Sequence, residues 1–369
     1  MKLFHIFACC SVIGLFLDLM LSGCGSHHAD SDDINNTVVD FGNADFSRWE
    51  NVMEIDTIIP LGEPKDSLIL SLANKCIFAD GKILFSDYKD GNLYAFDSDG
   101  KFLYQAGQKG QGKGEYARIR DIAISADSSL IEVLDGISIK RYSATDGKFV
   151  DEVSLPDIKM SRYYQFMPLY DGKYLLFTPD EEYSIQLYTP GDGIRNLREK
   201  KGAQVITTRF VKTKEDIVVL PDYGQFILDS FNGEELTQRC RLDFGGKTLP
   251  ESQLPKDTEE LQNVDMLPEY FKMVMNYIDS DSLVYMRCVG PKQIYYDIFL
   301  NKDSSKNYAG PSDRKNNIVT IGADGSKMLG LVYPEYVNTS SIIYPAVSRY
   351  VDAGHDNPLL IKYSINLWQ

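Results

Sequence analysis

The chain has 369 residues, of which 43% are hydrophobic, and it carries a formal net charge of −15 at pH 7. A chain of this length exceeds the usual size of one hydrophobic core, so we expect either two domains or one large repetitive β architecture. The acidic excess argues against nucleic acid as a partner, because Lys and Arg side chains supply most of the affinity for phosphate groups. Neutral or cationic partners fit this charge better.

The N-terminal segment has the features of a signal peptide. Lys2 precedes an apolar run that ends at Leu21-Ser22-Gly23-Cys24. The run is too short and too poorly flanked for a membrane span, which is typical of a cleaved signal peptide. The small residues before Cys24 resemble the lipobox of bacterial lipoproteins, in which the Cys thiol is acylated and becomes the new N-terminus. We therefore predict a signal peptide over residues 1–23 and a lipid on Cys24; ordinary secretory cleavage, with Cys24 as a bystander, is the alternative.

Residues 24–48 are predicted to form a flexible tether. After Cys24 the chain reads GSHHADSDDINN, which is polar and acidic and has no apolar period, as expected of a flexible linker. We therefore expect an outer membrane lipoprotein, attached to the membrane through the lipid on Cys24 and facing either the periplasm or the cell surface. The acidic residues Asp30, Asp32 and Asp33 resemble export signals of surface lipoproteins, but acidic tethers are common, so both faces stay open.

From residue 82 onward one pattern of short strands recurs. Between Lys82 and Ala106 three alternating segments are joined by Asp-Gly turns, which is typical of an antiparallel meander. Related stretches follow at 129–155, 173–197, 216–242 and 282–308. One aromatic residue before each turn marks the repeat: Phe96, Tyr142, Tyr188, Phe231 and Phe299. The first three gaps, of about 46, 46 and 43 residues, match the four-stranded blades of a β-propeller.

The fourth gap, of about 68 residues, indicates an insertion. The excess falls around residues 247–270, and the only helix candidates lie within 257–277. After Asn317 about 50 residues remain, enough for a sixth blade. The segment VMEIDTIIPL at 52–61 alternates like a strand, and we expect it to join the last blade and close the ring, which protects strand edges. The predicted fold is all-β: a six-bladed β-propeller of four-stranded antiparallel blades in a single domain over residues 49–369.

The stretch GQKGQGKGEY, residues 107–116, resembles a phosphate loop at first sight. Gly107, Gly112 and Lys113 have nearly the Walker spacing. However, Gly114 stands where a Ser or Thr would hold magnesium, and the following ARIRDIAIS alternates like a strand instead of opening a helix. The repeat explains the loop better, as the connection from the outermost strand of the first blade to the innermost strand of the second. We expect it to cross the face of the ring toward the central channel, with glycines allowing its sharp turns.

Three features together resemble a known family. They are the GQKGQGKGEY loop followed by a strand, the DSLIL stretch at 66–70 before the first blade, and the closing NPLLIKYSI at 357–365. They resemble the six-bladed β-propeller lipoproteins of Gram-negative gut anaerobes, which are related to NHL-repeat propellers; the family form usually has Pro where this chain has Lys113. The resemblance covers essentially all of the mature chain and implies the fold and export. Most members have no established activity, so it implies little about function.

Related six-bladed propellers include calcium-dependent lactonases and phosphotriesterases, and lyases that use His ligands. Without the signal peptide only His27, His28 and His355 remain, and the first two lie in the tether. No His triad or zinc site can therefore form in the ring, and His355 is expected in a loop. Carboxylate-only Ca²⁺ sites leave little spacing pattern, so no metal ligand is assigned, and no catalytic residue is assigned either.

Three cysteines, Cys76, Cys240 and Cys288, remain besides Cys24 in the mature chain. They permit at most one disulfide. Each lies among apolar residues of β type, so we expect buried, free thiols. No CxxC pair is present, which argues against structural zinc.

The candidate binding surface is the channel mouth near the Gly-rich loop, where charged and aromatic residues come together. The first group of candidates is Glu115, Tyr116, Arg118, Arg120 and Asp121, and a second, weaker group is Tyr163 and Tyr164 at the start of the third blade. These charged residues could instead form ion pairs that fix one blade against the next, and the Tyr rings could pack between blades.

Taken together, these features predict a monomeric, non-enzymatic binding or scaffold protein with no cofactor. Its partner would be a glycan, a peptide or another outer membrane protein. The alternative is a Ca²⁺-dependent hydrolase or lyase with carboxylate ligands in the central channel.

Overall fold

A computed structural model describes residues 36–38, 53–62, 70–158, 162–265, 267–303, 307–312 and 318–366. The predicted signal peptide (1–23), the lipidation site Cys24 and most of the predicted tether (24–48) lie outside these ranges. Among the helices in the described ranges, none has the length and apolar character that a membrane span requires.

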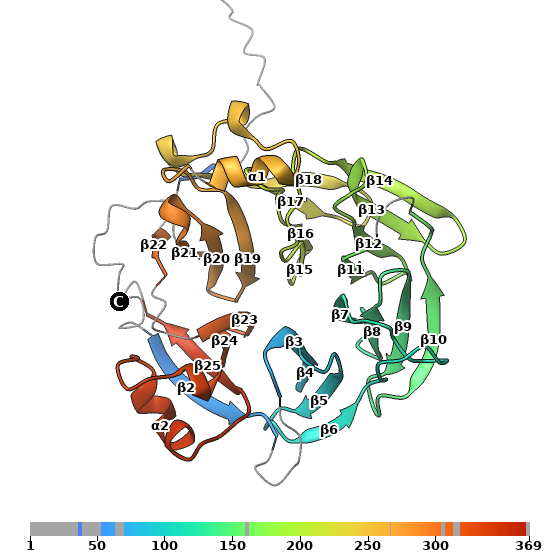
Figure 1. Cartoon of the computed structure of the whole chain (residues 1–369), viewed down its shortest axis with the longest axis vertical. Helices are drawn as coiled ribbons and strands as arrows, with labels where there is room; N and C mark the ends of the chain where they lie inside the picture. Colours follow the sequence, from blue (N-terminus) through green and yellow to red (C-terminus); the bar gives the residue numbers. More distant parts are fainter. Residues whose placement is uncertain are drawn as a thin grey trace, which may run out of the picture. The chain divides into compact units, whose positions relative to one another are not determined.

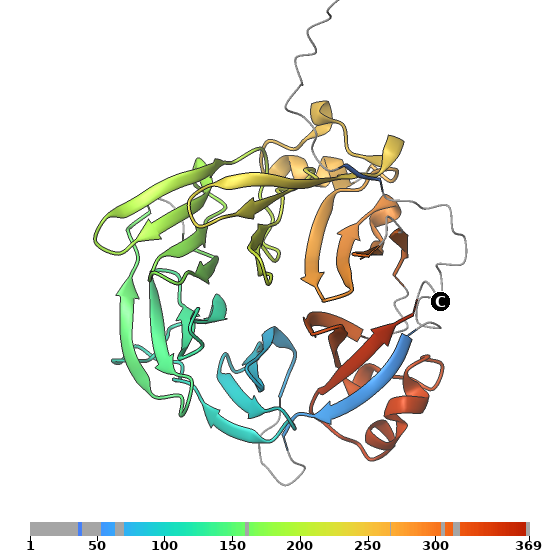
Figure 2. The same cartoon turned by 180° about the vertical axis from the view of Figure 1, so that it is seen from behind.

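Six antiparallel sheets, here called blades 1 to 6, surround a central channel, as both views of the ring show (Figures 1 and 2). In blades 1 to 5 the strands follow the chain from the channel outward. Blade 1 contains β3 (Ala73–Ala79), β4 (Lys82–Asp87), β5 (Leu93–Asp97) and β6 (Phe102–Gln105); blade 2 contains β7 (Asp121–Ile124), β8 (Leu130–Leu134), β9 (Ser138–Ser143) and β10 (Phe149–Ser154); blade 3 contains β11 (Gln165–Pro168), β12 (Tyr174–Phe177), β13 (Tyr183–Thr189) and β14 (Gly193–Glu199); blade 4 contains β15 (Phe210–Lys212), β16 (Ile217–Val219), β17 (Ile227–Phe231) and β18 (Leu236–Asp243); blade 5 contains β19 (Met273–Asp279), β20 (Leu283–Val289), β21 (Tyr295–Asn301) and β22 (Asn307–Pro311). The predicted all-β, six-bladed fold is confirmed.

Blade 6 closes the ring with strands from both ends of the described chain. It contains β23 (Ile318–Asp324), β24 (Lys327–Val332), β25 (Leu359–Ile365) and β2 (Met53–Pro60). Strand β2 runs antiparallel to β25, with Met53 opposite Ile365 and Pro60 opposite Leu359. In Figure 1 the blue β2 lies beside the red β25. The predicted joining of the N-terminal strand to the last blade is therefore confirmed.

The aromatic residues that mark the repeat occupy equivalent positions. Phe96, Tyr142, Tyr188, Phe231 and Phe299 lie on the third strands of blades 1 to 5, namely β5, β9, β13, β17 and β21. None of these five side chains is more than 8% exposed. They belong to apolar clusters that each join two neighbouring blades. Burying a side chain of this size contributes about 1.5–3 kcal/mol, so each repeat contributes an apolar contact that stabilises the packing of neighbouring blades.

The connection from β18 to β19 is the long one that the repeat spacing indicates. It contains three short helices: η2 (Gly245–Lys247), η3 (Glu251–Gln253) and α1 (Thr258–Asp265). Leu249, Leu254 and Leu261 from this connection belong to a small apolar cluster with Tyr223. The excursion is therefore anchored to blade 4 by its own apolar contacts. Two further short helices, η4 (Pro291–Gln293) and η5 (Pro334–Tyr336), lie within turns of blades 5 and 6.

A second α-helix corrects the expectation that helices are confined to residues 257–277. Helix α2 (Tyr344–Asp352) follows β24 and precedes β25. Ile343 and Val347 are buried in the cluster shared by blades 5 and 6, and Val351 packs against it, so a spacing of four residues puts one apolar stripe on the sheet. The stripe is short and consists of β-branched residues, which is why the sequence pattern hides it.

Strand β1 (Asn36–Val38) modifies the expectation of a fully flexible tether. It pairs in parallel with β18, from Asn36 opposite Arg241 to Val38 opposite Asp243. The outermost strand of a blade leaves one edge of main-chain groups unpaired, and a short extended segment can pair with that edge. These three residues of the predicted tether therefore belong to the sheet of blade 4.

Candidate functional site

The Gly-rich loop (107–116) joins β6 to β7, which confirms its predicted place in the chain. It packs against β9 and β10 of blade 2, and the chain continues from it to β7, the innermost strand of that blade. The Tyr142 hydroxyl on β9 donates a hydrogen bond to the Gly114 carbonyl at 3.1 Å. A Cβ atom at Gly114 would lie 2.6 Å from the ring of Phe149 on β10, and one at Gly107 would lie 2.6 Å from the Tyr142 ring. The glycines therefore let two aromatic rings contact the loop backbone directly.

Two of the predicted site residues hold this loop together. The Glu115 carboxylate accepts hydrogen bonds from the Gly112 amide at 2.8 Å and from Gln108 Nε2 at 2.5 Å. These two bonds, that of the amide first, lower the pKa of Glu115. Tyr116 is fully buried, and its ring meets the Tyr142 ring edge to face. Tyr116 therefore packs between blades 1 and 2 and does not belong to an exposed surface, which corrects its expected role.

Segments from four consecutive blades meet in one cavity, here called the channel-mouth cavity. Its volume is about 390 Å³, and it lies where the inner strands of blades 1 to 4 begin. Its lining residues are Asn74, Lys75, Arg118, Ile119, Arg120, Asp121, Tyr164, Gln165, Ile206, Thr207, Thr208 and Phe210. Four of the predicted site residues, Arg118, Arg120, Asp121 and Tyr164, are thus brought together.

Asp121 connects three blades from the wall of this cavity. The side chain is 5% exposed, and its Oδ1 atom lies 2.7 Å from Nζ of Lys75 on β3. Its Oδ2 atom accepts a hydrogen bond from the Phe166 amide on β11 at 3.1 Å. This residue therefore has the inter-blade role that the sequence left open as an alternative to ligand binding.

Arg118 and Arg120 differ from Asp121 because they have no charged partner. Neither side chain forms an ion pair or a hydrogen bond with another residue of the described ranges, although the Arg120 amide donates to the Leu134 carbonyl at 2.8 Å. The guanidinium carbon of Arg120 lies 4.4 Å from the centroid of the Tyr164 ring, and the buried Nε atom of Arg120 lacks a hydrogen-bond partner there. The cation–π contact with Tyr164 therefore orients the guanidinium group while its two terminal nitrogens stay available as hydrogen-bond donors.

The two tyrosines of the second predicted group have different environments. Tyr164 lines the cavity and is half-buried. Tyr163 is 1% exposed, and its hydroxyl donates a hydrogen bond to the Pro156 carbonyl at 3.3 Å. Tyr163 thus packs between blades 2 and 3 and cannot contact a ligand in the cavity, which corrects its predicted place at the surface.

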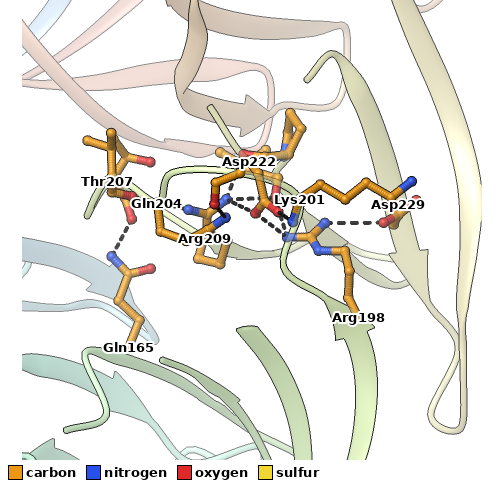
Figure 3. A network of polar contacts seen from close by, with 12 residues as sticks. Gln165, Arg198, Lys201, Gln204, Thr207, Arg209, Asp222 and Asp229 are labelled. Carbon is orange, nitrogen blue, oxygen red and sulfur yellow. Dashed lines mark hydrogen bonds and ion pairs between the residues drawn. The ribbon is translucent and has the colours of Figure 1, made fainter. Parts of the chain in front are cut away.

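The fourth wall of the cavity is the crossing segment 200–209 between β14 and β15. Gln165 Nε2 donates a hydrogen bond to the Thr207 carbonyl at 2.5 Å, which ties blade 3 to this segment (Figure 3). Arg209, at the end of the segment, is fully buried and donates hydrogen bonds to the carbonyls of Val205 at 3.1 Å and Pro221 at 2.6 Å. Its Nη1 atom also lies 3.3 Å from Oδ1 of Asp222. A buried ion pair therefore holds the residues that form this wall.

Sequence reasoning missed Lys75, Asn74, Gln165 and the wall segment 206–208. The repeat contained a signal for some of them: adding the spacing of about 46 residues to Lys75 leads to Asp121, and a spacing close to it leads from Asp121 to Gln165. Residues at equivalent positions of neighbouring blades lie side by side at the channel in a propeller. Applying the period to the charged candidates would therefore have found the neighbours that complete the cavity.

A second cavity, of about 550 Å³, lies along the inner strands of blades 1 to 6. Asp80, Asp279 and Asp281 are among its lining residues. Within the described ranges, however, no group of three or more His, Cys, Asp or Glu side chains is placed to hold a metal ion. His355 lies in the turn after α2, as predicted, and burial lowers its pKa.

The cysteines of the ring are free thiols, as predicted. Cys76 and Cys288 are buried and Cys240 is half-buried. Burial raises the pKa of the Cys76 thiol to about 12 and that of Cys240 to about 11. Because the thiolate is the reactive form, these side chains are unreactive at neutral pH.

A closed ring of six four-stranded blades with a polar cavity at the channel mouth defines a six-bladed β-propeller. The model of the family DUF5128, described as a 6-bladed beta-propeller, matches residues 26–321. The chain therefore belongs to this family. Among curated proteins no match to the sequence is found.

Two solved structures have a similar fold. A Bacteroides fragilis protein named as an exported protein is 17% identical, with a TM-score of 0.72 over 90% of this chain and 99% of the other. A Bacteroides vulgatus member of the DUF4221 family is 11% identical, with a TM-score of 0.57 over 86% of this chain and 99% of the other. At these identities the similarity shows the fold.

Proposed function

We propose that this protein is an exported binding protein whose ligand occupies the channel-mouth cavity. The observation that carries this proposal is the pair Arg118 and Arg120, whose side chains line a cavity of about 390 Å³ and form no ion pair with a residue of the described ranges. Small-molecule sites have volumes of about 300–1,000 Å³ and contain a few converging polar groups. The ligand would be a glycan, a peptide or a segment of a partner protein, and binding requires no cofactor.

Rigid support for the cavity favours binding over a purely structural role. Asp121 and Gln165 join neighbouring blades, and the buried Arg209 holds the wall segment. Side chains that are fixed in advance lose little conformational entropy when a ligand binds. A purely structural ion-pair network would not place two arginines without acidic partners in the same cavity, because their positive charges repel each other.

The proposal is tested by screening detergent-purified full-length protein on glycan and peptide arrays. Thr208 is exposed and lines the cavity, so Thr208→Trp should fill the cavity without disturbing the core. The matched control is Thr237→Trp, because Thr237 is exposed on the outermost strand of blade 4. We expect array binding that Thr208→Trp abolishes and Thr237→Trp preserves; binding that survives Thr208→Trp would overturn the proposed site.

We also propose that a lipid on Cys24 tethers the protein to the outer membrane, facing the periplasm or the cell surface. The LSGC sequence that ends the N-terminal apolar run supports this proposal, as does the name of the exported Bacteroides fragilis protein with the same fold. Replacing Cys24 by Ala should move the protein from the membrane fraction to the soluble fraction of fractionated cells. If the variant stays with the membranes, the lipid is not the anchor.

A further inference from the structure

We propose that the channel-mouth cavity selects an acidic sugar, namely a uronate unit at the end of an oligosaccharide, through Arg118 and Arg120. This inference rests on the proposed function and names the chemical class of its ligand. The two arginines would bind the carboxylate of the uronate, and neighbouring polar side chains would bind its hydroxyl groups.

The charge of the cavity wall favours an anion. Lys75, Arg118 and Arg120 are cationic, whereas Asp121 is the single anionic residue of the lining. The Lys75 ammonium group lies 2.7 Å from Asp121, so these two charges compensate each other. The charges of Arg118 and Arg120 remain uncompensated in the described chain, and a ligand with one carboxylate would neutralise part of this excess.

The flat guanidinium group of Arg120 is placed so that it can bind a carboxylate. Its shape matches a carboxylate better than a single point charge would. The Tyr164 ring, 4.4 Å from its guanidinium carbon, holds the flat group on one face. A guanidinium fork matches the two oxygens of a carboxylate with parallel hydrogen bonds, which are about twice as strong as neutral ones. A Cβ atom at Gly136 would lie 3.1 Å from Nε of Arg120, so a glycine at this position leaves room for the side chain.

The uncharged part of the lining fits the hydroxyl groups of a sugar. Asn74, Gln165, Thr207 and Thr208 contribute side-chain amides and hydroxyls, which both donate and accept hydrogen bonds. Peptides are commonly recognised by main-chain hydrogen bonds along a strand edge. Here the walls are the crossing segments before β7 and β15 and the first residues of the inner strands. The recognition groups are therefore side chains at strand ends, which favours a sugar over an acidic peptide.

The net charge of the whole chain does not exclude an anionic ligand. The formal charge of −15 is spread over 369 residues, and exposed charges are screened over about 8 Å at physiological ionic strength. The arginines that face the cavity act at contact distance, where screening is weak. We therefore expect binding of an anion to weaken with added salt but to persist at physiological ionic strength.

The test is isothermal titration calorimetry of the detergent-purified full-length protein with defined oligosaccharides. The acidic probes are trigalacturonate, trimannuronate and a glucuronate-containing disaccharide. The methyl ester of each probe is its neutral counterpart, and tetraglutamate is the acidic peptide probe. The protein variants are Arg118→Gln and Arg120→Gln, separately and combined. Arg241→Gln, at an exposed position on β18, is the matched control.

We expect at least one acidic sugar to bind at least about tenfold more tightly than its methyl ester, which corresponds to the loss of one good charge-assisted contact. The combined arginine variant should remove this preference, whereas Arg241→Gln should keep it. Stronger binding of tetraglutamate, no binding of any acidic sugar, or equal binding of acid and ester would each overturn the inference. Equal binding of acid and ester that Thr208→Trp still abolishes would leave the proposed function intact, so the two failures are distinguishable.

Discussion

The guanidinium group of Arg209 lies 3.3 Å from the carboxylate of Asp222, and both side chains are almost completely buried. Asp222 also lies 3.4 Å from Arg198, whose second terminal nitrogen is 3.2 Å from Asp229 (Figure 3). Burial lowers the pKa of Arg209 to about 10, against the opposing effect of Asp222, so the arginine stays charged at neutral pH. The wall of the channel-mouth cavity thus depends on an ion-pair network that joins β14 of blade 3 to blade 4.

Removing one member of this network should destabilise the fold strongly. Asp222→Asn leaves the buried Arg209 charge uncompensated, for which we expect a loss of about 3 kcal/mol in the free energy of unfolding. Urea denaturation followed by far-UV circular dichroism measures this loss. Lys148→Gln breaks the exposed pair with Asp146, at 2.7 Å, and should change stability little. Equal effects of the two substitutions would contradict the assigned role.

Glu132 predicts a pH dependence of stability. Its side chain, 2% exposed, faces blade 3, where the Tyr174 hydroxyl donates a hydrogen bond to it at 3.2 Å. Burial raises its pKa to about 7, from 4.5 in an exposed chain, although Tyr174 and Arg141 act in the opposite direction. The folded state therefore favours the protonated acid. This stabilisation is fully present below pH 4.5 and is lost as the pH rises to about 7.

The substitution Glu132→Gln should remove this dependence, because an amide does not ionise. Above pH 7 the variant should be more stable than the wild type by up to about 3 kcal/mol, which corresponds to the shift in pKa. At pH 4.5 the two proteins should unfold at nearly the same urea concentration. A stability difference that does not vary between pH 4.5 and 8 would show that Glu132 keeps an ordinary pKa.

Gly114 should tolerate substitution poorly for two separable reasons. Its φ of +76° is unfavourable for other residues, and an added Cβ would lie 2.6 Å from the Phe149 ring. Gly172 has a φ of +75° with no atom near an added Cβ, so Gly172→Ala reports the backbone effect alone, about 1–2 kcal/mol. We expect Gly114→Ala to cost about 1–3 kcal/mol more because of overpacking. Equal decreases of the unfolding temperature in Gly114→Ala and Gly172→Ala would mean that the Phe149 ring moves away freely.

The blade pattern was predictable because each repeat carries its own local chemistry. Asp-Gly turns recur in blades 1 to 3 and one aromatic residue recurs on the third strand of blades 1 to 5, and both depend on short-range geometry. The pairing of β2 with β25 was also predictable, since a strand without a blade of its own fits the open edge of the last sheet. The local patterns define the strands, and the closure of the ring then determines which strand pairs with the edge of the last blade.

The candidate site was less predictable because burial depends on distant residues. Tyr116 and Arg118 are two positions apart in one segment, yet Tyr116 is fully buried and Arg118 is exposed. Nothing in the local sequence distinguishes a ring that packs on Tyr142 from one that faces solvent. Arg209 presents the same difficulty: its partner Asp222 follows only after the two strands β15 and β16, and most arginines in loops are exposed.

Calcium should not stabilise the protein. An ion that binds the folded state raises the unfolding temperature, and the proposed binding function requires no ion. Differential scanning fluorimetry with excess CaCl₂ or EDTA should therefore give the same Tm as buffer of equal ionic strength. A clear increase with calcium alone would support the alternative of a metal-dependent hydrolase or lyase.

Hydrogen–deuterium exchange with and without the best-binding array member tests the central claim, that the ligand lies in the channel-mouth cavity. The segments around Arg118–Asp121, Tyr164–Phe166 and Val205–Phe210 line or support this cavity. We predict that bound ligand slows amide exchange in these three segments, which belong to three different blades, and leaves the outer strands β10 and β14 unchanged. Protection confined to the outer strands, or to blades 5 and 6, would contradict the account.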